Sequence, residues 1–190
     1  MRNLILRMQL TLDGVAASVD GKPIDGVDHG DDDSWRDTFA TLGSVDTMLL
    51  GAGMHAEYLD YWKSVLTDAN AKPNDKKFAE RAARTPHFVL SRSLSGSLRW
   101  PNAQILEGGV EGIAALKAAP GGDIMMWGGP TAAAAVIEAE LFDEFHVETH
   151  PIIAGQGKKL FDRVGMPHRA RRLTVDAFPS GLTVVKYAHS

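Results

Sequence analysis

Short apolar runs recur along the chain, and each is followed by a turn or by a segment with helical spacing. The runs that fit buried strands are residues 4–10, 46–50, 87–90, 104–106 and 124–127. Apolar residues three or four positions apart predict helices at residues 34–42, 54–65, 109–119 and 131–140. Strands that alternate with helices in this way are typical of an α/β fold with a largely parallel sheet.

The last third of the chain follows a different pattern, in which apolar and polar residues alternate. Residues 144–149 alternate throughout, which predicts a strand with one polar face. Residues 171–187 contain two further runs on either side of a Pro-Ser-Gly turn, which predicts an antiparallel hairpin. We therefore expect a single α/β domain over residues 1–190. Its central sheet would be mixed and mostly parallel, with helices on both faces and a C-terminal antiparallel hairpin.

Two segments show no sustained periodicity. Residues 19–33 are polar and rich in glycine and proline, and a loop of this length in a compact domain is often functional. Residues 72–84 are highly charged and contain only a short helix candidate, around residues 78–83.

Composition excludes several classes of protein. The net charge is −4, without a long run of Lys or Arg, so nucleic acid is not an expected partner. The absence of cysteine excludes disulfides, thiolate metal sites and a cysteine nucleophile, and no residue spacing suggests another metal site. No apolar run approaches the roughly 20 residues that span a membrane, and residues 1–8 do not form a signal peptide. We expect a cytoplasmic protein that acts on a small molecule.

The strand at residues 124–127 ends in the most informative turn of the chain. Gly128 and Gly129 follow it directly, and Pro130 then opens the next helix. Glycine allows a ligand to approach the backbone closely, and proline suits the first turn of a helix. The first N–H groups of a helix have no partner within the helix and bind anions well. This turn therefore predicts a phosphate site.

Three other strand ends carry related features, at residues 11–14, 51–53 and 91–92. Ligands of open α/β sheets bind beyond the carboxyl ends of the strands. The hydroxyl of Ser91 and the planar guanidinium of Arg92 would suit a phosphate monoester, such as the 2′-phosphate of NADP. Together these ends predict a dinucleotide site, although the fingerprint of three spaced glycines is absent.

The order of the motifs carries a family resemblance that extends over essentially the whole chain. In chain order the motifs are Thr11–Gly14, Leu49–Gly51, Ser91–Arg92, Gly122–Ile124, Gly128–Gly129, Phe142–Glu144, Pro151–Gly157 and Leu160–Phe161. This set resembles the dihydrofolate reductase-like superfamily. It is most similar to the group that shares the C-terminal reductase domain of the bacterial riboflavin-biosynthesis protein. The motif at residues 151–157 is the most specific of the set.

The resemblance implies an NADPH-dependent reductase that transfers hydride to a heterocyclic or carbonyl small molecule. NADH is a possible second cofactor, and relatives often form homodimers, so we expect a homodimer. The pyrophosphate would lie between the helix starts at Gly51 and Gly129. The residues expected to bind the cofactor are Leu12, Gly51, Ala52, Ser91, Arg92, Trp127, Gly128, Gly129, Pro130 and Thr131.

Two departures from the family pattern bear on cofactor and substrate. Many members have arginine where this chain has Ala52, which weakens the preference for NADPH over NADH. The pyrimidine reductases of riboflavin synthesis usually have Asp-Asp-Pro after the Gly-x-Gly motif, and glutamate before the double glycine. This chain lacks the first and has Trp127 at the second position. Indole offers one donor and a stacking face but no charge, which argues against the ribityl-pyrimidine substrate.

The proton donor has two candidates. Dihydrofolate reductase uses a carboxylate on the helix after the first long loop, and Asp31, Asp32, Asp33 and Asp37 lie in that region. We select Asp33 because it directly precedes the predicted helix. Asp13, a turn residue expected beside the nicotinamide, is the second candidate.

Three alternatives remain open beside a reductase of unknown substrate. One is 5-amino-6-(5-phosphoribosylamino)uracil reductase of riboflavin biosynthesis, and another is dihydrofolate reductase itself. The third is a nucleotide-binding protein without turnover. Assays on the two substrates and a search for hydride transfer would separate them.

Overall fold

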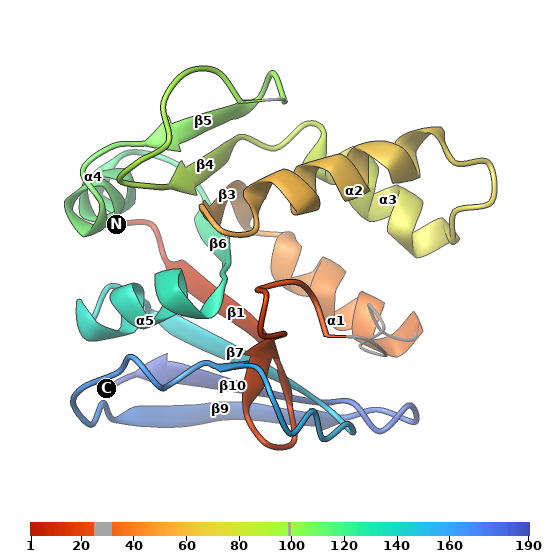
Figure 1. Cartoon of the computed structure of the whole chain (residues 1–190), viewed down its shortest axis with the longest axis vertical. Coiled ribbons are helices and arrows are strands. Elements are labelled where there is room, and N and C mark those ends of the chain that lie inside the picture. Colours follow the sequence, from red (N-terminus) through yellow and green to blue (C-terminus); the bar gives the residue numbers. More distant parts are fainter. Residues whose placement is uncertain (25–31, 99) are drawn as a thin grey trace.

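The computed structural model describes residues 1–24, 32–98 and 100–190, and shows a central sheet with helices on both faces (Figure 1). The strands of this sheet are β1 (Leu4–Thr11), β3 (Val45–Gly51), β4 (His87–Leu90), β5 (Ala103–Leu106), β6 (Asp123–Trp127), β7 (Glu144–His150), β9 (Ala170–Ala177) and β10 (Thr183–His189). Their order across the sheet is β5-β4-β3-β6-β1-β7-β10-β9.

The strands from β5 to β7 are parallel to their neighbours, whereas β10 runs antiparallel to both β7 and β9. The predicted mixed, mostly parallel sheet with a C-terminal hairpin is therefore confirmed. A small second sheet pairs β2 (Val15–Ala17) with β8 (Lys158–Lys159). The sequence did not predict these two strands, because runs of three and two residues are too short to show a period.

The helices form two layers. They are α1 (Asp32–Leu42), α2 (His55–Thr67), α3 (Pro73–Ala82), α4 (Val110–Ala118) and α5 (Pro130–Glu138). On β1, Leu4 and Leu6 pack in the core shared with α4 and α5, whereas Ile5 packs in the core shared with α1, α2 and α3. This alternation follows from the two-residue period of a strand, and it places the residue at position 7 on the α1 face.

Helix α3 begins earlier than the sequence predicted. The charged residues 75–77 gave no apolar period, so only residues 78–83 were expected to be helical. Pro73 at the first helical position begins the helix, and Phe78, Ala79 and Ala82 supply its buried face. Among the helices in the described ranges, none has the length and apolar character needed to cross a membrane.

His87, at the start of β4, is expected to make stability depend on pH. It is fully buried, and its ring centroid lies 5.7 Å from that of Tyr58 and 5.4 Å from that of Trp100. Burial lowers the pKa of His87 from 6.5 to about 4. Between these values the unfolded chain binds a proton that the folded chain does not. The free energy of unfolding should therefore fall by about 3 kcal/mol as pH drops from 6.5 to 4.

Urea unfolding across this pH range tests the prediction. The variant His87→Phe keeps an aromatic ring but cannot titrate, and its stability should change less over the same range. If the variant and the wild type show the same pH dependence, His87 is not its source.

Candidate functional site

A cavity of about 1800 Å³ lies where β3, β4, β5 and β6 end. Because these strands are parallel, their carboxyl ends meet at one edge of the sheet. Residues of β1, β7, α1 and α2 also line the cavity. All the predicted cofactor residues except Leu12 line this space: Gly51, Ala52, Ser91, Arg92, Trp127, Gly128, Gly129, Pro130 and Thr131.

The end of β3 lies against the first turn of α5 at the rim of the cavity. A Cβ on Gly51 would lie 3.0 Å from the Cβ of Ala132 and 3.4 Å from the backbone nitrogen of Gly129. Glycine at position 51 therefore allows the end of β3 to meet the first turn of α5. The start of α5 carries partial positive charge, and the turn from β3 into α2 lines the same cavity, so this rim suits a diphosphate.

The backbone at Gly129 leaves open space above the start of α5. Gly129 is the N-cap residue, with φ −71° and ψ 154°, and a Cβ at this position would meet no atom within 4 Å. Its carbonyl accepts hydrogen bonds from the backbone nitrogens of Ala132 and Ala133, each at 3.1 Å. A ligand can thus approach the first turn of α5 without meeting a side chain at position 129.

The loop after β4 supplies polar groups to the same rim. The Ser91 hydroxyl accepts hydrogen bonds from the backbone nitrogens of Ser93 and Leu94, at 3.2 and 2.9 Å. This leaves the Ser91 O–H free to donate to an anion. Arg92 is exposed and lines the cavity. The Ser91 hydroxyl and the Arg92 guanidinium, the groups expected to bind a phosphate monoester, are therefore both available at this rim.

Aromatic side chains line the inner part of the cavity. They come from α1, α2, α3 and β6: Trp35, Tyr58, Tyr61, Trp62, Phe78 and Trp127. The ring centroids of Trp62 and Phe78 lie 4.4 Å apart, and those of Phe78 and Trp127 lie 6.0 Å apart. Trp62 and Phe78 are buried in the core and also reach the cavity wall. Flat apolar walls of this kind suit a planar ring.

A buried ionic network lies against this aromatic region, and sequence reasoning missed it. The Arg7 side chain is fully buried and forms an ion pair with Glu148 of β7. Arg7 Nη2 also donates to Thr38 Oγ1 at 2.8 Å, and Arg7 Nη1 lies 3.3 Å from Asp37 Oδ2. Asp37 in turn pairs with Lys186 of β10. The network joins α1 to three strands beside the cavity.

The missed signal was a charged residue at a position where the strand pattern requires burial. Arg7 follows Ile5 on the α1 face of β1, and its register partners are Trp127 on β6 and His146 on β7. The polar face predicted for β7 is buried rather than exposed, with Glu148 only 4% exposed. An arginine in the middle of an apolar strand needs a buried acid, and Glu148 is that acid.

The two predicted proton donors, Asp33 and Asp13, lie in different parts of the fold. Asp33 lies in α1, but its side chain is outside the described part of the structure. Asp13 Oδ1 accepts hydrogen bonds from the Thr11 hydroxyl and the Ala154 nitrogen, at 2.7 and 3.0 Å, and Oδ2 accepts one from the Gly155 nitrogen at 2.8 Å. These hydrogen bonds, that from Thr11 first, lower the pKa of Asp13 to about 2. Neither Asp13 nor Leu12 is among the cavity-lining residues, so both roles stay predictions.

The motif at residues 151–157, the most specific of those that carry the family resemblance, has a clear structural role. Gly157 has φ +140°, and a Cβ there would lie 2.5 Å from the backbone oxygen of Ala17. Only glycine fits at this position. The close approach of Gly157 to β2 and the Asp13 hydrogen bonds thus join the segment after β7 to β2 and to the turn after β1.

Comparison with known proteins agrees with this architecture. The model of the RibD C-terminal domain family matches residues 2–184, and the chain belongs to that family. The uncharacterised protein YyaP of Bacillus subtilis is 27% identical over 189 residues, which are 98% of this chain and 94% of YyaP.

Two solved structures illustrate the likeness in fold. A candidate riboflavin biosynthesis protein from Shewanella sp. PV-4 has a TM-score of 0.70 at 22% identity, covering 99% of both chains. Dihydrofolate reductase from Enterococcus faecalis, solved with NADP(H), has a TM-score of 0.63 at 13% identity, covering 99% of this chain and 96% of that enzyme. The predicted dihydrofolate reductase-like fold is confirmed.

Proposed function

We propose that this protein is an NADPH-dependent reductase that transfers hydride to a heterocyclic or carbonyl small molecule. The observation that carries the proposal is the convergence of four separate strand ends on one cavity of about 1800 Å³. This volume exceeds that of a pocket for one drug-sized ligand, and it is large enough for a dinucleotide beside a small substrate.

The residues at the rim fit a dinucleotide. The start of α5 at Gly129 and the turn that leads from Gly51 into α2 would bind the pyrophosphate, and Ser91 with Arg92 would bind the 2′-phosphate. Bound reduced nicotinamide supplies hydride. The protein would orient the ring at Trp127 and exclude water with its aromatic walls.

Arg92 should distinguish NADPH from NADH. With alanine at position 52, Arg92 is the cation proposed to pair with the 2′-phosphate, and no ion pair within the described residues occupies it. Arg92→Ala should weaken NADPH binding about tenfold, the value of one charge-assisted pair, and change NADH binding by less than about twofold. Titration calorimetry with both cofactors measures this, and Arg84→Ala, an exposed residue after α3, is the control. Equal losses for NADPH and NADH would show that Arg92 does not bind the phosphate.

The substrate is proposed only by class. Trp127 stands where a pyrimidine reductase would have an acid, so we place the ribityl-pyrimidine of riboflavin synthesis second and dihydrofolate third. An assay with NADPH and a panel of pyrimidines, pterins and carbonyl compounds tests turnover by loss of the reduced nicotinamide absorbance. Oxidation of NADPH by any member supports a reductase. Tight NADPH binding without oxidation across the panel would favour a nucleotide-binding protein without turnover.

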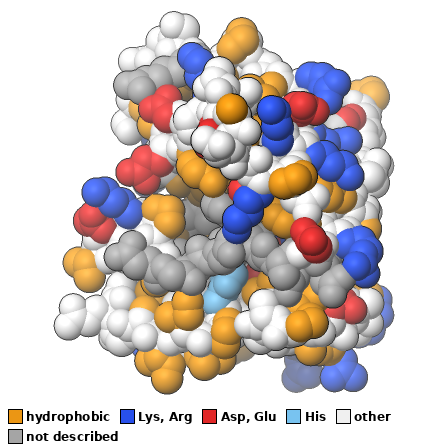
Figure 2. Space-filling view, turned by 90° about the vertical axis from the view of Figure 1, so that its right-hand side faces the viewer, with side chains coloured by type: hydrophobic (Ala, Val, Ile, Leu, Met, Phe, Trp, Pro, Cys, Tyr) orange, Lys and Arg blue, Asp and Glu red, His pale blue; other side chains and the backbone are white. Residues whose placement is uncertain are grey.

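We also propose a homodimer formed through the C-terminal edge of the sheet. All eight residues of β9 are exposed, and Leu173 and Val175 point to the same face with 39% and 51% exposure. Figure 2 shows hydrophobic side chains along the lower edge of the molecule, where β9 and β10 lie in Figure 1.

Light scattering after gel filtration tests the dimer. The wild type should have twice the mass of the chain, and Leu173→Asp with Val175→Asp should reduce it to one chain. Thr174→Asp, on the opposite face of β9, should leave the dimer intact. A wild type that elutes with the mass of one chain would refute it.

A further inference from the structure

Among the described residues that line the cavity, one carboxylate is buried and has a protein partner on only one of its oxygens. Glu148 is 4% exposed and lines the cavity, and its ion pair uses only Oε1, which contacts Arg7. No other polar contact of Glu148 occurs within the described residues. Because Glu148 lines the cavity, a ligand can bring an N–H group to its second oxygen and form a charge-assisted hydrogen bond there.

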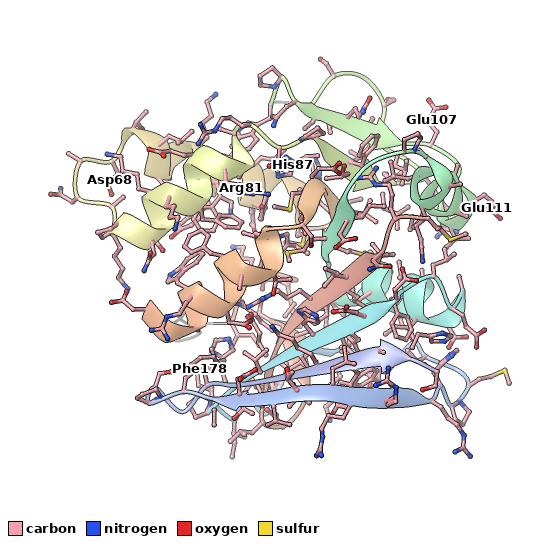
Figure 3. All side chains as sticks on the ribbon, turned by 180° about the vertical axis from the view of Figure 1, so that it is seen from behind. Asp68, Arg81, His87, Glu107, Glu111 and Phe178 are labelled. Atoms are coloured by element: carbon pink, nitrogen blue, oxygen red, sulfur yellow. The ribbon has the colours of Figure 1, made fainter. Side chains whose placement is uncertain are left out.

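The other carboxylates near the cavity, among the side chains that the structure describes, are paired or exposed. Asp37 uses both oxygens, one on Arg7 and the other on Lys186. Asp20, Glu57, Glu107 and Glu111 line the cavity but are exposed. Figure 3 shows Glu107 and Glu111 at the outer edge, beside β5 and α4.

The groups around Glu148 define what can bind there. Trp127 Nε1 is a buried donor without a partner, and the Arg7 guanidinium lies 5.6 Å from the centre of the Trp127 ring. The network also has two carboxylates, Asp37 and Glu148, for two cations, Arg7 and Lys186, so it offers no excess positive charge to an anionic ligand. Between the aromatic walls, Glu148 offers an acceptor and Trp127 Nε1 offers a donor. Together they suit the edge of a flat, uncharged ring.

We propose that Glu148 is a specificity-determining residue that binds an N–H group of the substrate. Arg7 is the positioning residue that fixes the carboxylate. The substrate class is a planar heterocycle with a ring N–H or an amino substituent, and an acceptor that reaches Trp127. This inference rests on the proposed reductase function and assigns its substrate-recognition group to β7.

Two small probes separate N–H recognition from stacking. 2,4-Diaminopyrimidine offers N–H donors, whereas 2,4-dimethoxypyrimidine has the same ring with every donor removed. Calorimetry on protein saturated with NADPH should show that the wild type binds the diamino compound at least about tenfold more tightly, as expected for a charge-assisted hydrogen bond. In Glu148→Gln this preference should drop to about twofold or less.

Two control variants test whether the preference for the diamino compound depends on the charge of Glu148. Arg7→Met/Glu148→Met removes both charges together and should also lose the preference, so the test survives if Glu148→Gln folds poorly. Glu80→Gln, at an exposed acid on α3, should keep it. Thermal unfolding and NADPH titration accompany every variant.

The results separate the two proposals. A wild type that binds the two pyrimidines equally, or binds neither, overturns the role of Glu148, as does a double variant that keeps the preference. Any of these three results, with NADPH binding intact, leaves the reductase proposal standing. A wild type that does not bind NADPH overturns the reductase proposal itself.

Discussion

Replacing Arg7 with methionine should lower the free energy of unfolding by about 3–5 kcal/mol. The Arg7 side chain is fully buried and contacts Glu148, Asp37 and Thr38. Its removal leaves Glu148 as an uncompensated buried charge, since no other polar partner reaches it within the described residues. Urea unfolding by circular dichroism measures the loss.

The double variant Arg7→Met/Glu148→Met distinguishes a lost ion pair from lost packing. It removes both charges, and Asp37 keeps its pair with Lys186. Replacing a whole buried pair by apolar groups is often nearly neutral, so the double variant should recover most of the loss. Arg84→Met, at an exposed site, should change stability by less than about 0.5 kcal/mol. A double variant as unstable as Arg7→Met would contradict this account of the network.

The substitution Gly129→Asp should abolish cofactor binding without destabilising the fold. The Cβ of residue 129 would point into open space, and its φ of −71° suits any L-residue. A carboxylate at this point would lie beside the proposed pyrophosphate. Two like charges about 4 Å apart repel by about 4 kcal/mol at an effective dielectric of 20, so NADPH affinity should fall at least about 100-fold.

The same change should stabilise the helix, because aspartate is a favourable N-cap residue at the start of α5. Gly129→Asn has the same shape without the charge, and it should bind NADPH more tightly than Gly129→Asp by at least about tenfold. Titration calorimetry and thermal unfolding measure both effects. If the aspartate and asparagine variants bind NADPH equally well, the diphosphate does not lie at this helix start.

Strand ends were the part of the site that the sequence could predict. Gly51, Ser91 and Gly128 each follow an apolar run directly, so local pattern alone places them at one edge of a parallel sheet. The structure brings these positions to one cavity. The ordered motifs also led to the family, because they extend along the whole chain.

The buried network was not predictable by the same means. The alternation on β7 marks Glu148 as a residue of the polar face, and a polar face normally lies in solvent. Its burial depends on contacts with Arg7 on β1 and on the helix that covers both. Such contacts join residues far apart in sequence, and no local period reports them.

Titration of the wild-type protein with NADPH is the most direct test of the central claim that this cavity binds a dinucleotide. Quenching of tryptophan fluorescence can follow it, since Trp127 lines the cavity. We predict saturable binding of one NADPH per chain, lost in Gly129→Asp and retained in Gly129→Asn. The absence of saturable binding of both NADPH and NADH up to about 1 mM, an affinity of about −4 kcal/mol, would contradict the account.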